Sequence, residues 1–389
     1  MREEGSQPQQ TEFSDLKASV LRGEILCSLK AQGFNVNPHL RPKHDGKATL
    51  RRIHRMKRLE QLRLHKHFLQ WYSSRARENG LDGKDIRPEE IRLKLFPVTP
   101  GSEFANLFFW WNLIWWSIPY EHPIGRYMRF IIWDKEHDAP FGLLGLQSPP
   151  LRSNVRDNYL GIQGRSVDYW VNQSLNATRV GALPPYNMLL GGRMVAMALT
   201  ANEIRDHYAL KYASSTLMRK RRIPGRLLFT TTTSAFGRGS IYERLTYKQR
   251  PLNRFIGFTS GSGTFHLPNN LYVRLLGLME EKGIDVKRGY GTGTSRKLRL
   301  VKRGSQILGL PNFAFHNVQR GYYLFPNVTN LSAVLHQRAK PRWKRLPFDS
   351  LANYWQERWC VPRASRFNDW REFETARFFR SASAQIRRL

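Results

Sequence analysis

The stretch LLFTTTTSAFGRGSIYERLTYK, residues 227–248, predicts the fold class of the chain. An apolar lead-in runs into four consecutive threonines, a Gly-Arg-Gly-Ser turn follows, and a helix is expected from Ile241 and Tyr242. A strand that ends in small hydroxyl residues and breaks at a glycine turn is typical of α/β proteins, which bind ligands at such strand ends. The stretch therefore predicts an α/β core with a site at this turn.

The sequence around this turn alternates strand and helix patterns from residue 126 to 267. Residues 126–150 predict a β-hairpin, followed by a strand, a Pro-Pro-Tyr-Asn turn and a helix from about Leu189. Arg156 and Asp157 are expected at the start of a strand or loop. The segment RFIGFTSGSGTFHL predicts another strand, which ends at His266. The fold class expected is α/β (α+β), a mixed sheet with flanking helices.

The N-terminal region predicts two helices, over residues 15–34 and 45–80. In the second, one face is expected to be apolar, with Ile53, Met56, Leu59, Leu62 and Phe68. The rest of that helix carries many cations, among them Arg51, Arg52, Arg55, Lys57, Arg58 and Arg63. These six are predicted to lie along a phosphate backbone, and the alternative is a solvated helix face.

Charge is the strongest compositional signal. The 389 residues contain 63 Lys and Arg against 30 Asp and Glu, which gives a net charge of +33 and a pI near 10.7. An excess of this size favours a polyanionic partner, DNA or RNA, over a small metabolite. An anionic membrane surface is the alternative, but no basic stretch has a clear lipid-facing side. The sequence therefore predicts a nucleic-acid partner and no membrane.

Cysteine usage and hydropathy indicate the cellular compartment of the chain. Cys27 and Cys360 are far apart, which argues against a disulfide framework and a thiolate zinc site. The polar N-terminus has no apolar signal-peptide core, so a reducing cytoplasm is expected. The apolar run at 107–118 is shorter than the ~20 residues that span a bilayer, and its tryptophans are predicted to be buried.

Two further segments are basic. The loop at 286–303 has seven Lys and Arg and no acid, and residues 336–389 have 13 basic against 5 acidic residues, interleaved with aromatic residues. Both are predicted to contact nucleic acid, and a docked amphipathic helix is the alternative for the C-terminal segment. The candidate contacts are Lys287, Arg288, Arg296, Lys297, Arg299, Arg342, Lys344 and Arg345. The expected regions are a basic helical part (1–90), an α/β core (91–335) and a basic aromatic extension (336–389).

A set of blocks occurs in a fixed order along the core: RFIIWD with FGLLGLQSPP and RDNYLGI, then RVGALPPYNMLLGGRMVAMALTANEIRDHY, FTTTTSAFGRGSIYERL and IGFTSGSGTFHL. Together they resemble the Druantia anti-phage system protein A family over roughly residues 110–330. The resemblance implies a bacterial defence protein, or a relative carried on a mobile element. It implies other defence proteins as partners, a helicase among them, and supplies no catalytic mechanism.

The core also resembles, more distantly, the acetyltransferase-like (GNAT) fold and the phage Mom protein, a GNAT-like modifier of adenine in DNA. In that fold a helix after the fourth strand starts at a glycine-bearing pyrophosphate loop, and LLGGRMVAMAL stands at such a position here. Tyr242 falls where these enzymes often keep a general acid. The chain departs from the pattern because Met188, Leu189 and Leu190 precede Gly191. The cofactor therefore stays unnamed.

Two turns are candidates for binding an anionic cofactor. Gly191, Gly192 and Arg193 open a helix, where backbone N–H groups and the dipole favour a phosphate; close packing is the alternative. The second turn offers hydroxyls, glycine N–H groups and a guanidinium that could clamp an anion. Its members are Ser234, Gly237, Arg238 and Ser240. An exposed turn is the alternative there, and Ser240 is expected to cap the next helix.

Candidate catalytic residues are Tyr242, Asp157 and His266. Tyr242 and Asp157 are predicted to transfer protons, although Asp157 could instead pair with Arg156. His266 could shuttle a proton, with a core histidine as the alternative. The sequence has no zinc-protease motif, paired-cysteine spacing, Walker loop or nucleophile elbow, so no metal is expected.

Three functions follow from these observations. The first is a DNA-binding protein of a defence system whose GNAT-like core modifies nucleic acid. The second is a non-catalytic nucleic-acid recognition subunit of a defence or mobile-element complex. The third is a nuclease, which ranks last because the chain has no clustered carboxylate motif.

Overall fold

The computed structural model describes residues 7–44, 46–119, 122–123, 125–213, 223–235, 237–287 and 295–389, without the side chains of residues 7–14 and Arg165. Contacts divide the chain into two compact units. The helical unit lies within Met1–Glu60, Ser117–Pro119 and Thr259–Gln319, and the sheet unit within Gln61–Trp116, Tyr120–Phe258 and Arg320–Leu389. The region boundaries expected at 90/91 and 335/336 stay a prediction, since they rest on composition.

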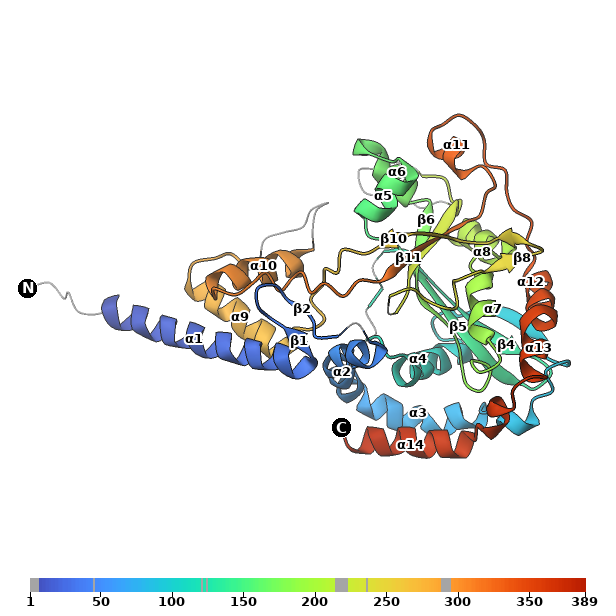
Figure 1. The fold of residues 1–389 in the computed structure, drawn as a ribbon, viewed down its shortest axis with the longest axis horizontal. Helices are drawn as coiled ribbons and strands as arrows, with labels where there is room; N and C mark the ends of the chain where they lie inside the picture. The colour runs from blue at the N-terminus through green and yellow to red at the C-terminus, as the bar shows by residue number, and fades with distance from the viewer. Residues whose placement is uncertain are drawn as a thin grey trace, which may run out of the picture. The chain divides into compact units, whose positions relative to one another are not determined.

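A seven-stranded mixed sheet organises the sheet unit (Figure 1). Its order is β10-β11-β7-β6-β5-β4-β3, and every neighbouring pair is antiparallel except β6 and β7. The strands are β3 (Leu93–Pro97), β4 (Tyr127–Asp134), β5 (Ala139–Gln147), β6 (Ser174–Ala182), β7 (Phe229–Thr233), β10 (Arg254–Phe258) and β11 (Gly321–Pro326). The hairpin expected over 126–150 is confirmed by β4 and β5, and the mixed α/β class is confirmed by the sheet and its helices.

The parallel pair β6–β7 creates a distinct edge of the sheet. Pairing runs from Ser174↔Phe229 to Ala177↔Thr232, and β6 then continues to Ala182 without β7 beside it. Parallel strands present their carboxyl ends at the same edge, and ligands of α/β proteins bind outside such ends. The threonine-rich stretch that predicted the fold therefore ends at this edge.

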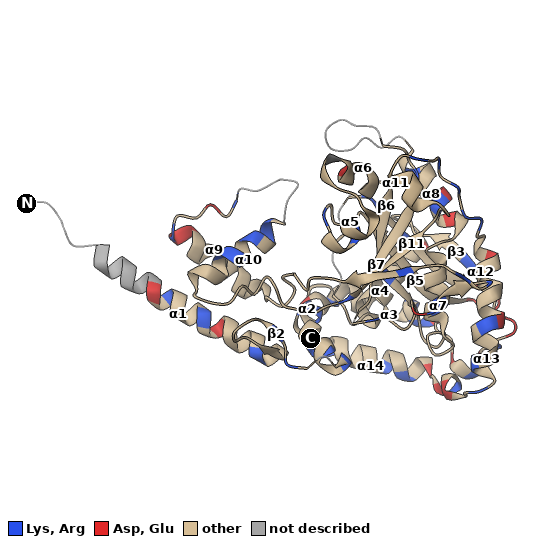
Figure 2. Ribbon diagram, turned by 45° about the horizontal axis from the view of Figure 1, so that its top comes forward, with Lys and Arg blue, Asp and Glu red and all other residues tan. Residues whose placement is uncertain are grey.

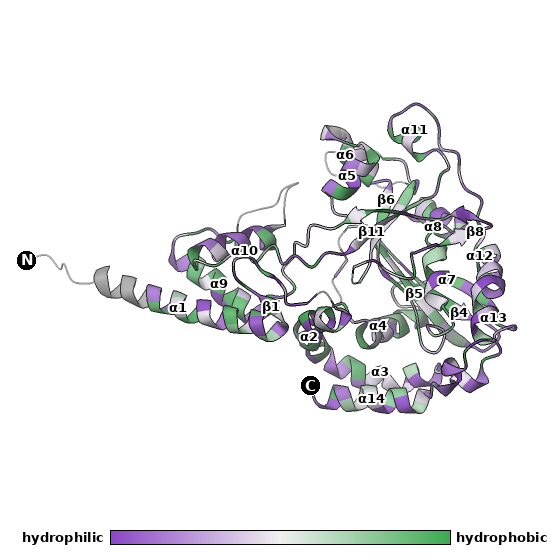
Figure 3. Cartoon of the chain, viewed as in Figure 1, coloured by the Kyte–Doolittle hydropathy of each residue, from purple (hydrophilic) through white to green (hydrophobic). Residues whose placement is uncertain are grey.

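Helices bury the apolar residues of the sheet. They include α4 (Glu103–Trp115), α7 (Gly191–Ala198), α8 (Asn202–Tyr212) and α12 (Phe348–Trp355). Phe141 on β5, Met194 on α7 and Trp355 on α12 belong to one buried cluster. Figure 3 shows the apolar residues concentrated on the strands and on α7. Of the four tryptophans predicted to be buried in the apolar run, Trp110 and Trp111 are buried, whereas Trp115 and Trp116 are half-buried, so the prediction is confirmed for the first pair alone.

Smaller elements complete the sheet unit. A second buried cluster forms where α5 (Asn154–Leu160), α6 (Val167–Val171) and α11 (Leu331–Leu335) pack around residues of β7 and β11. A two-stranded sheet pairs β8 (Thr246–Tyr247) with β9 (Arg250–Pro251). The helix α3 (Lys66–Glu78) packs against α14 (Thr375–Arg387), and a π-helical turn at Gln356–Cys360 joins α12 to α13 (Val361–Ala364).

The helical unit is built on α1 (Gln7–Gln32), α9 (Asn269–Glu281) and α10 (Arg296–Ile307). The first contacts α9, which contacts α10. Lys17 pairs with Glu281 at 2.9 Å, and Gly304 of α10 lies so close to α9 that a Cβ there would come within 2.6 Å of Leu275. Two short strands, β1 (Phe34–Asn35) and β2 (Arg41–Pro42), also belong here, as does the start of α2 (Lys47–Leu64).

Several sequence-based expectations are wrong in detail. The helix expected over 45–80 is interrupted, because His65 leaves helical geometry between α2 and α3 (φ −106°, ψ 18°), and Asp45 lies outside the described residues. Met56 is 45% exposed, although it was placed on the apolar face. The helix expected from Ile241 is a series of turns, because Arg244 adopts a left-handed φ of 53° that a helix cannot contain.

Two of the proposed catalytic residues occupy other elements than expected. Arg156 and Asp157 lie on α5 rather than at the start of a strand or loop, and α5 ends at Gly161 with a left-handed φ of 64°. His266 lies in a turn before α9, beyond the end of β10 at Phe258. None of the helices in the described ranges is both long and apolar enough to span a membrane.

Candidate functional site

Two turns predicted from the sequence lie against each other at the carboxyl edge of β6 and β7. Arg193, in the first turn of α7, donates a hydrogen bond from Nη1 to the carbonyl of Glu243 at 2.8 Å. A Cβ on Gly192 would come within 2.9 Å of Ile241 Cγ2. The turn at 188–193 and the turn at 237–243 are thus in direct contact, and an apolar side chain fills the space between them.

Hydroxyl groups gather beneath these turns. Thr232 Oγ1 donates to the carbonyl of Ala177 at 2.9 Å and lies 3.5 Å from the Tyr242 hydroxyl. The ring of Tyr242 packs 4.7 Å from the ring of Tyr323. Burial raises the pKa of Tyr242 to about 12, because the phenolate would be desolvated. Tyr242 is therefore a proton-bearing group at the end of the threonine strand.

A second group of polar residues lies beside Tyr242, and two of its members, Arg238 and Glu243, reach the surface. Arg238 donates from Nε and Nη2 to Glu243, at 3.0 and 2.7 Å, and Tyr323 donates its hydroxyl to the same carboxylate at 2.6 Å. Burial opposes the ionisation of Glu243, but the hydrogen bonds from Tyr323 and Arg238 outweigh it and lower the pKa of Glu243. An anionic ligand would have to displace this carboxylate from Arg238.

The hydroxyl of Ser234 closes the glycine turn. It donates to the carbonyl of Gly237 and accepts from the N–H of Gly321 at 3.0 Å. Gly237 has a left-handed φ of 49°, which glycine adopts without strain. Ser240 is exposed, and the expected cap is wrong because turns, not a helix, follow it. These residues support the shape of the turn.

The opening of α7 is covered by the C-terminal segment. Trp355 donates its indole N–H to the carbonyl of Leu190 at 3.1 Å, and Arg363 donates to the carbonyl of Met188 at 3.1 Å. The Arg193 guanidinium lies 5.6 Å from the Trp359 ring. A Cβ on Gly191 would come within 2.7 Å of the Tyr186 carbonyl, so packing requires this glycine. The chain's own side chains therefore occupy the approach to the predicted cofactor turn.

Asp157 is engaged in a structural pair. Its carboxylate accepts from Arg156 Nε at 2.8 Å and from the N–H of Ser153 at 3.0 Å. Arg156 is fully buried and also donates to the carbonyls of Pro150 and Leu151, at 2.7 and 3.0 Å. Both partners are thus held by groups of the α5 region, as in the alternative considered for them.

His266 belongs to the helical unit, whereas Tyr242 and Asp157 belong to the sheet unit. Its ring is buried, with Phe34 at 5.6 Å and Phe265 at 5.4 Å in edge-on contact. Burial lowers the pKa of His266 to about 4, so the imidazole is neutral at pH 7. This environment is that of a core histidine. Within the described chain, no hydrogen bond joins any two of the three proposed catalytic residues.

A buried Tyr–Asp–His network escaped the sequence analysis. Tyr186 donates its hydroxyl to Asp134 Oδ2 at 2.8 Å, and His137 Nδ1 lies 2.7 Å from the same oxygen. Because His137 Nε2 accepts from the N–H of Arg87 at 3.0 Å, Nδ1 carries the proton. Burial and the Asp134 carboxylate raise the pKa of Tyr186 well above its usual value. The spacing of Asp134 and His137 in the hairpin turn was the available signal.

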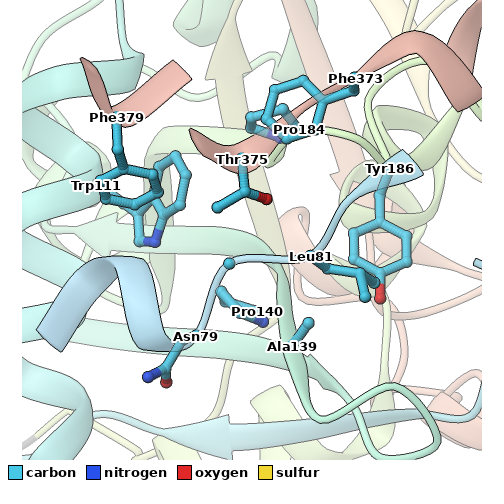
Figure 4. A pocket seen from close by; sticks show the side chains of 11 residues that line it. Asn79, Leu81, Trp111, Ala139, Pro140, Pro184, Tyr186, Phe373, Thr375 and Phe379 are labelled. Atoms are coloured by element: carbon cyan, nitrogen blue, oxygen red, sulfur yellow. The ribbon is translucent and has the colours of Figure 1, made fainter. Parts of the chain in front are cut away.

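The cavity next to Tyr186 is small (Figure 4). It has a volume of about 10 Å³, close to the least that holds a single water molecule. Trp111, Pro184 and Phe379 are among its lining residues. The network therefore stabilises the hairpin and the Pro-Pro-Tyr turn and has no room for a substrate.

The predicted nucleic-acid contacts of α2 differ in exposure. Arg51, Arg52, Arg55 and Arg63 are exposed. Lys57 is half-buried in an ion pair with Glu60 at 2.8 Å, and burial lowers the pKa of Arg58. The exposed arginines are thus the better placed of the six, and their contact with nucleic acid stays a prediction.

The other predicted contacts lie on three segments, and Figure 2 shows their charges along the ribbon. Lys287 is exposed, and Arg288 lies outside the described residues. Arg296 and Arg299 are exposed on α10, not in a loop as expected, and Lys297 lies 4.4 Å from the Tyr272 ring. Arg342 and Arg345 are exposed, whereas burial lowers the pKa of Lys344 to about 8.

The C-terminal aromatic residues separate into two groups. Trp355 and Trp370 are buried, and α14 docks on α3, so the docked-helix alternative describes this part of the segment. Trp343 and Phe367 are exposed, and each has a guanidinium over its ring, from Arg205 at 5.3 Å and Arg363 at 3.8 Å. In the described ranges, no cluster of three or more His, Cys, Asp or Glu residues could hold a metal ion.

Comparison with known proteins gives two findings. The family model described as Druantia protein DruA matches residues 44–337. A curated relative, the Druantia protein DruA of Escherichia coli (strain UMEA 4076-1), is 27% identical over 373 residues, which cover 94% of this chain and 92% of the relative. No solved structure shows a significant match.

Proposed function

We propose a nucleic-acid recognition function for this chain, which belongs to the Druantia protein DruA family and is a component of the Druantia anti-phage defence system. Of DNA and RNA, DNA is the partner that we propose. In this proposal the chain works in the cytoplasm as a recognition subunit beside other proteins of the system, a helicase among them. The net charge of +33 supports a polyanionic partner.

The exposed face of α10 carries this proposal. Arg296, Arg299, Lys302 and Arg303 are all exposed, and the helix sequence contains no acid. The opposite face, with Leu300, Val301, Gly304 and Ser305, is buried. A helix that is anchored by one face and presents four cations and no acid on the other suits a DNA groove, where Arg and Lys meet phosphates and base edges.

The state of the predicted cofactor turn favours recognition over chemistry. Trp355, Arg363 and Ile241 pack against the turn at 188–193, and Arg238 is already paired with Glu243. A phosphate-bearing cofactor would have to displace these contacts to reach the N-terminal end of α7. Recognition of nucleic acid requires no such rearrangement.

The test is equilibrium binding of the full chain to three fluorescein-labelled probes. They are a DNA duplex and an RNA duplex of 20 base pairs each, and a DNA single strand of 20 nucleotides. Binding should weaken steeply with NaCl, because each neutralised phosphate contributes a slope of about −0.9 in log K against log[salt] on B-DNA. Failure to bind any of the three at 50 mM NaCl, or binding that does not change with salt, would contradict the proposal.

Modification of DNA is a second candidate, favoured by the edge where β6 outruns β7. The helix α7 follows the fourth strand of the sheet and begins at Gly191, as in the acetyltransferase-like resemblance, and Tyr242 lies beside Thr232 at that edge. In this reading Tyr242 is the general acid. The test is nucleoside mass spectrometry of DNA from cells that express the wild type or Tyr242→Phe, and this candidate predicts a new nucleoside with the wild type that is lost or reduced with the variant. Identical nucleosides in both, and in cells without the protein, eliminate this candidate.

A further inference from the structure

A hollow of about 270 Å³ lies between α3 and α14, and none of the site residues predicted from the sequence lines it. It is lined by Ser73, Ser74, Arg77, Phe379, Arg380, Ser383 and Arg387. Three of these seven residues are arginines and three are serines, and none is acidic. The two helices lie side by side in the sheet unit (Figure 1).

The position of the hollow is fixed by aromatic packing. Phe379 of α14 stacks on Trp110 of α4 at 5.0 Å between ring centroids, and Phe378 stacks on Trp111 at 5.4 Å. Phe379 is buried and contributes to the lining. Because α14 is held on α4 in this way, the polar side chains on its neighbouring face keep their direction toward α3.

The arginines of the hollow are not neutralised by the chain itself. Arg380 and Arg387 lie on α14 two turns apart, with Ser383 between them, and Arg77 lies in the last turn of α3. All three are exposed, and across the described residues no ion pair or side-chain hydrogen bond engages any of them. Three like charges around one hollow repel each other, and an anion between them would relieve that repulsion.

The serines define what kind of anion fits. Ser73 donates its hydroxyl to the carbonyl of Leu69 at 2.5 Å and accepts from the Trp110 indole, so it cannot donate to a ligand. The hydroxyls of Ser74 and Ser383 form no hydrogen bond within the described chain, and both can donate. Guanidinium groups bind phosphate oxygens bidentately, and hydroxyl donors complete the coordination.

We propose that the hollow between α3 and α14 binds a phosphate group. Its volume is below the ~300 Å³ at which pockets for whole small molecules begin, so it fits a phosphate or pyrophosphate moiety rather than a complete cofactor. The phosphate belongs either to a nucleic-acid backbone or to a free phosphorylated ligand. The hollow is formed by residues of the sheet unit and α10 belongs to the helical unit, so this proposal does not rest on nucleic-acid recognition through α10.

The test compares two doubly substituted full-length proteins that lose equal charge from α14 and its C-cap residue, Arg388. Arg380→Gln with Arg387→Gln removes the α14 side of the hollow, and Arg377→Gln with Arg388→Gln removes exposed arginines that do not line it. Two probes are used, inorganic pyrophosphate in a thermal shift titration and a labelled 20-base-pair duplex in fluorescence anisotropy. The first variant should bind at least one probe about tenfold more weakly than the wild type, and the second within about threefold.

The probe that loses affinity identifies the source of the phosphate. Loss of the pyrophosphate shift alone indicates a free phosphorylated ligand, and loss of duplex affinity indicates the backbone. As a second readout, Arg77→Gln combined with Arg380→Gln should be non-additive, because both side chains contact one phosphate, whereas Arg77→Gln with Arg388→Gln should be additive. If both double variants behave alike with both probes while their melting temperatures match the wild type, the proposal is wrong.

Discussion

Replacement of the four exposed cations of α10 by glutamine should make DNA binding less sensitive to salt by a predictable amount. From Arg296 to Arg303 the helix rises by about 10.5 Å, at about 1.5 Å per residue. That length matches about three phosphates of one strand at an axial spacing of about 3.4 Å. With a slope of about 0.9 for each phosphate, the variant should lose about 2.7 from the slope of log K against log[salt].

The expected difference is large enough to measure directly. Between 50 and 200 mM NaCl the wild type should lose affinity by a factor roughly 40 times larger than the variant, because the two slopes differ by about 2.7. The assay is fluorescence anisotropy with a 20-base-pair duplex over a NaCl series. Stability should be kept, since the buried face of α10 is unchanged and glutamine favours helix.

The matched control removes four exposed cations of the sheet unit that lie outside the segments predicted to contact nucleic acid, Lys84, Lys135, Lys248 and Arg250. These substitutions lower the net charge equally, so general electrostatic attraction falls by the same amount in both proteins. The control should change the slope by less than about 1. Equal slopes in the two variants would show that α10 makes no direct phosphate contact, and the reasoning from its face would be refuted.

Three further predictions concern stability, each measured by urea unfolding followed by circular dichroism. Trp355→Ala should lower the free energy of unfolding by about 3–5 kcal/mol, because it opens a cavity in the main core and removes the hydrogen bond to the Leu190 carbonyl. Phe367→Ala, at a side chain that is 52% exposed, should lower it by less than about 1 kcal/mol. Equal losses would contradict the packing described for α12. Arg156→Met should cost about 3–5 kcal/mol, since it leaves Asp157 half of a broken buried pair, and a neutral result would mean that Asp157 is solvated. Burial lowers the pKa of His266 to about 4 in the folded protein, whereas the unfolded side chain titrates near pH ~6.5. The free energy of unfolding should therefore be highest above pH ~6.5 and fall by up to about 3 kcal/mol as the pH approaches 4, because the unfolded state binds the proton first. His266→Phe should flatten this pH dependence, and an unchanged profile would contradict the burial.

The sheet was predictable where the sequence carries local signals. The hairpin of β4 and β5, the strand of threonines and the helix at Gly191 all follow from hydrophobic runs bounded by turn residues. The elements that were missed depend on single backbone conformations. Arg244 ends the expected helix because it adopts a positive φ, and His65 divides the long basic helix. Neither arginine nor histidine has a conformational preference strong enough to predict these backbone angles from sequence.

The candidate site was harder to predict, because its chemistry is set by pairs distant in sequence. Glu243 acquires its role from Arg238 nearby and from Tyr323, which is 80 residues away. The covering of the α7 turn depends on Trp355, 165 residues from the carbonyl that it contacts. Composition could indicate a polyanionic partner, but which arginines are exposed and which are consumed by the fold depends on these long-range contacts.

The interleaving of the two units along the chain has a consequence for biosynthesis. About 200 residues separate Glu60, where the first stretch of the helical unit ends, from Thr259, where the last begins. A ribosome that adds about 5–20 residues per second leaves α1 without α9 for roughly 10–40 s. During that interval the apolar residues Leu21, Ile25 and Leu29, which are buried in the finished protein, remain exposed. Nascent chains stalled before residue 259 should therefore be preferred clients of ribosome-associated chaperones.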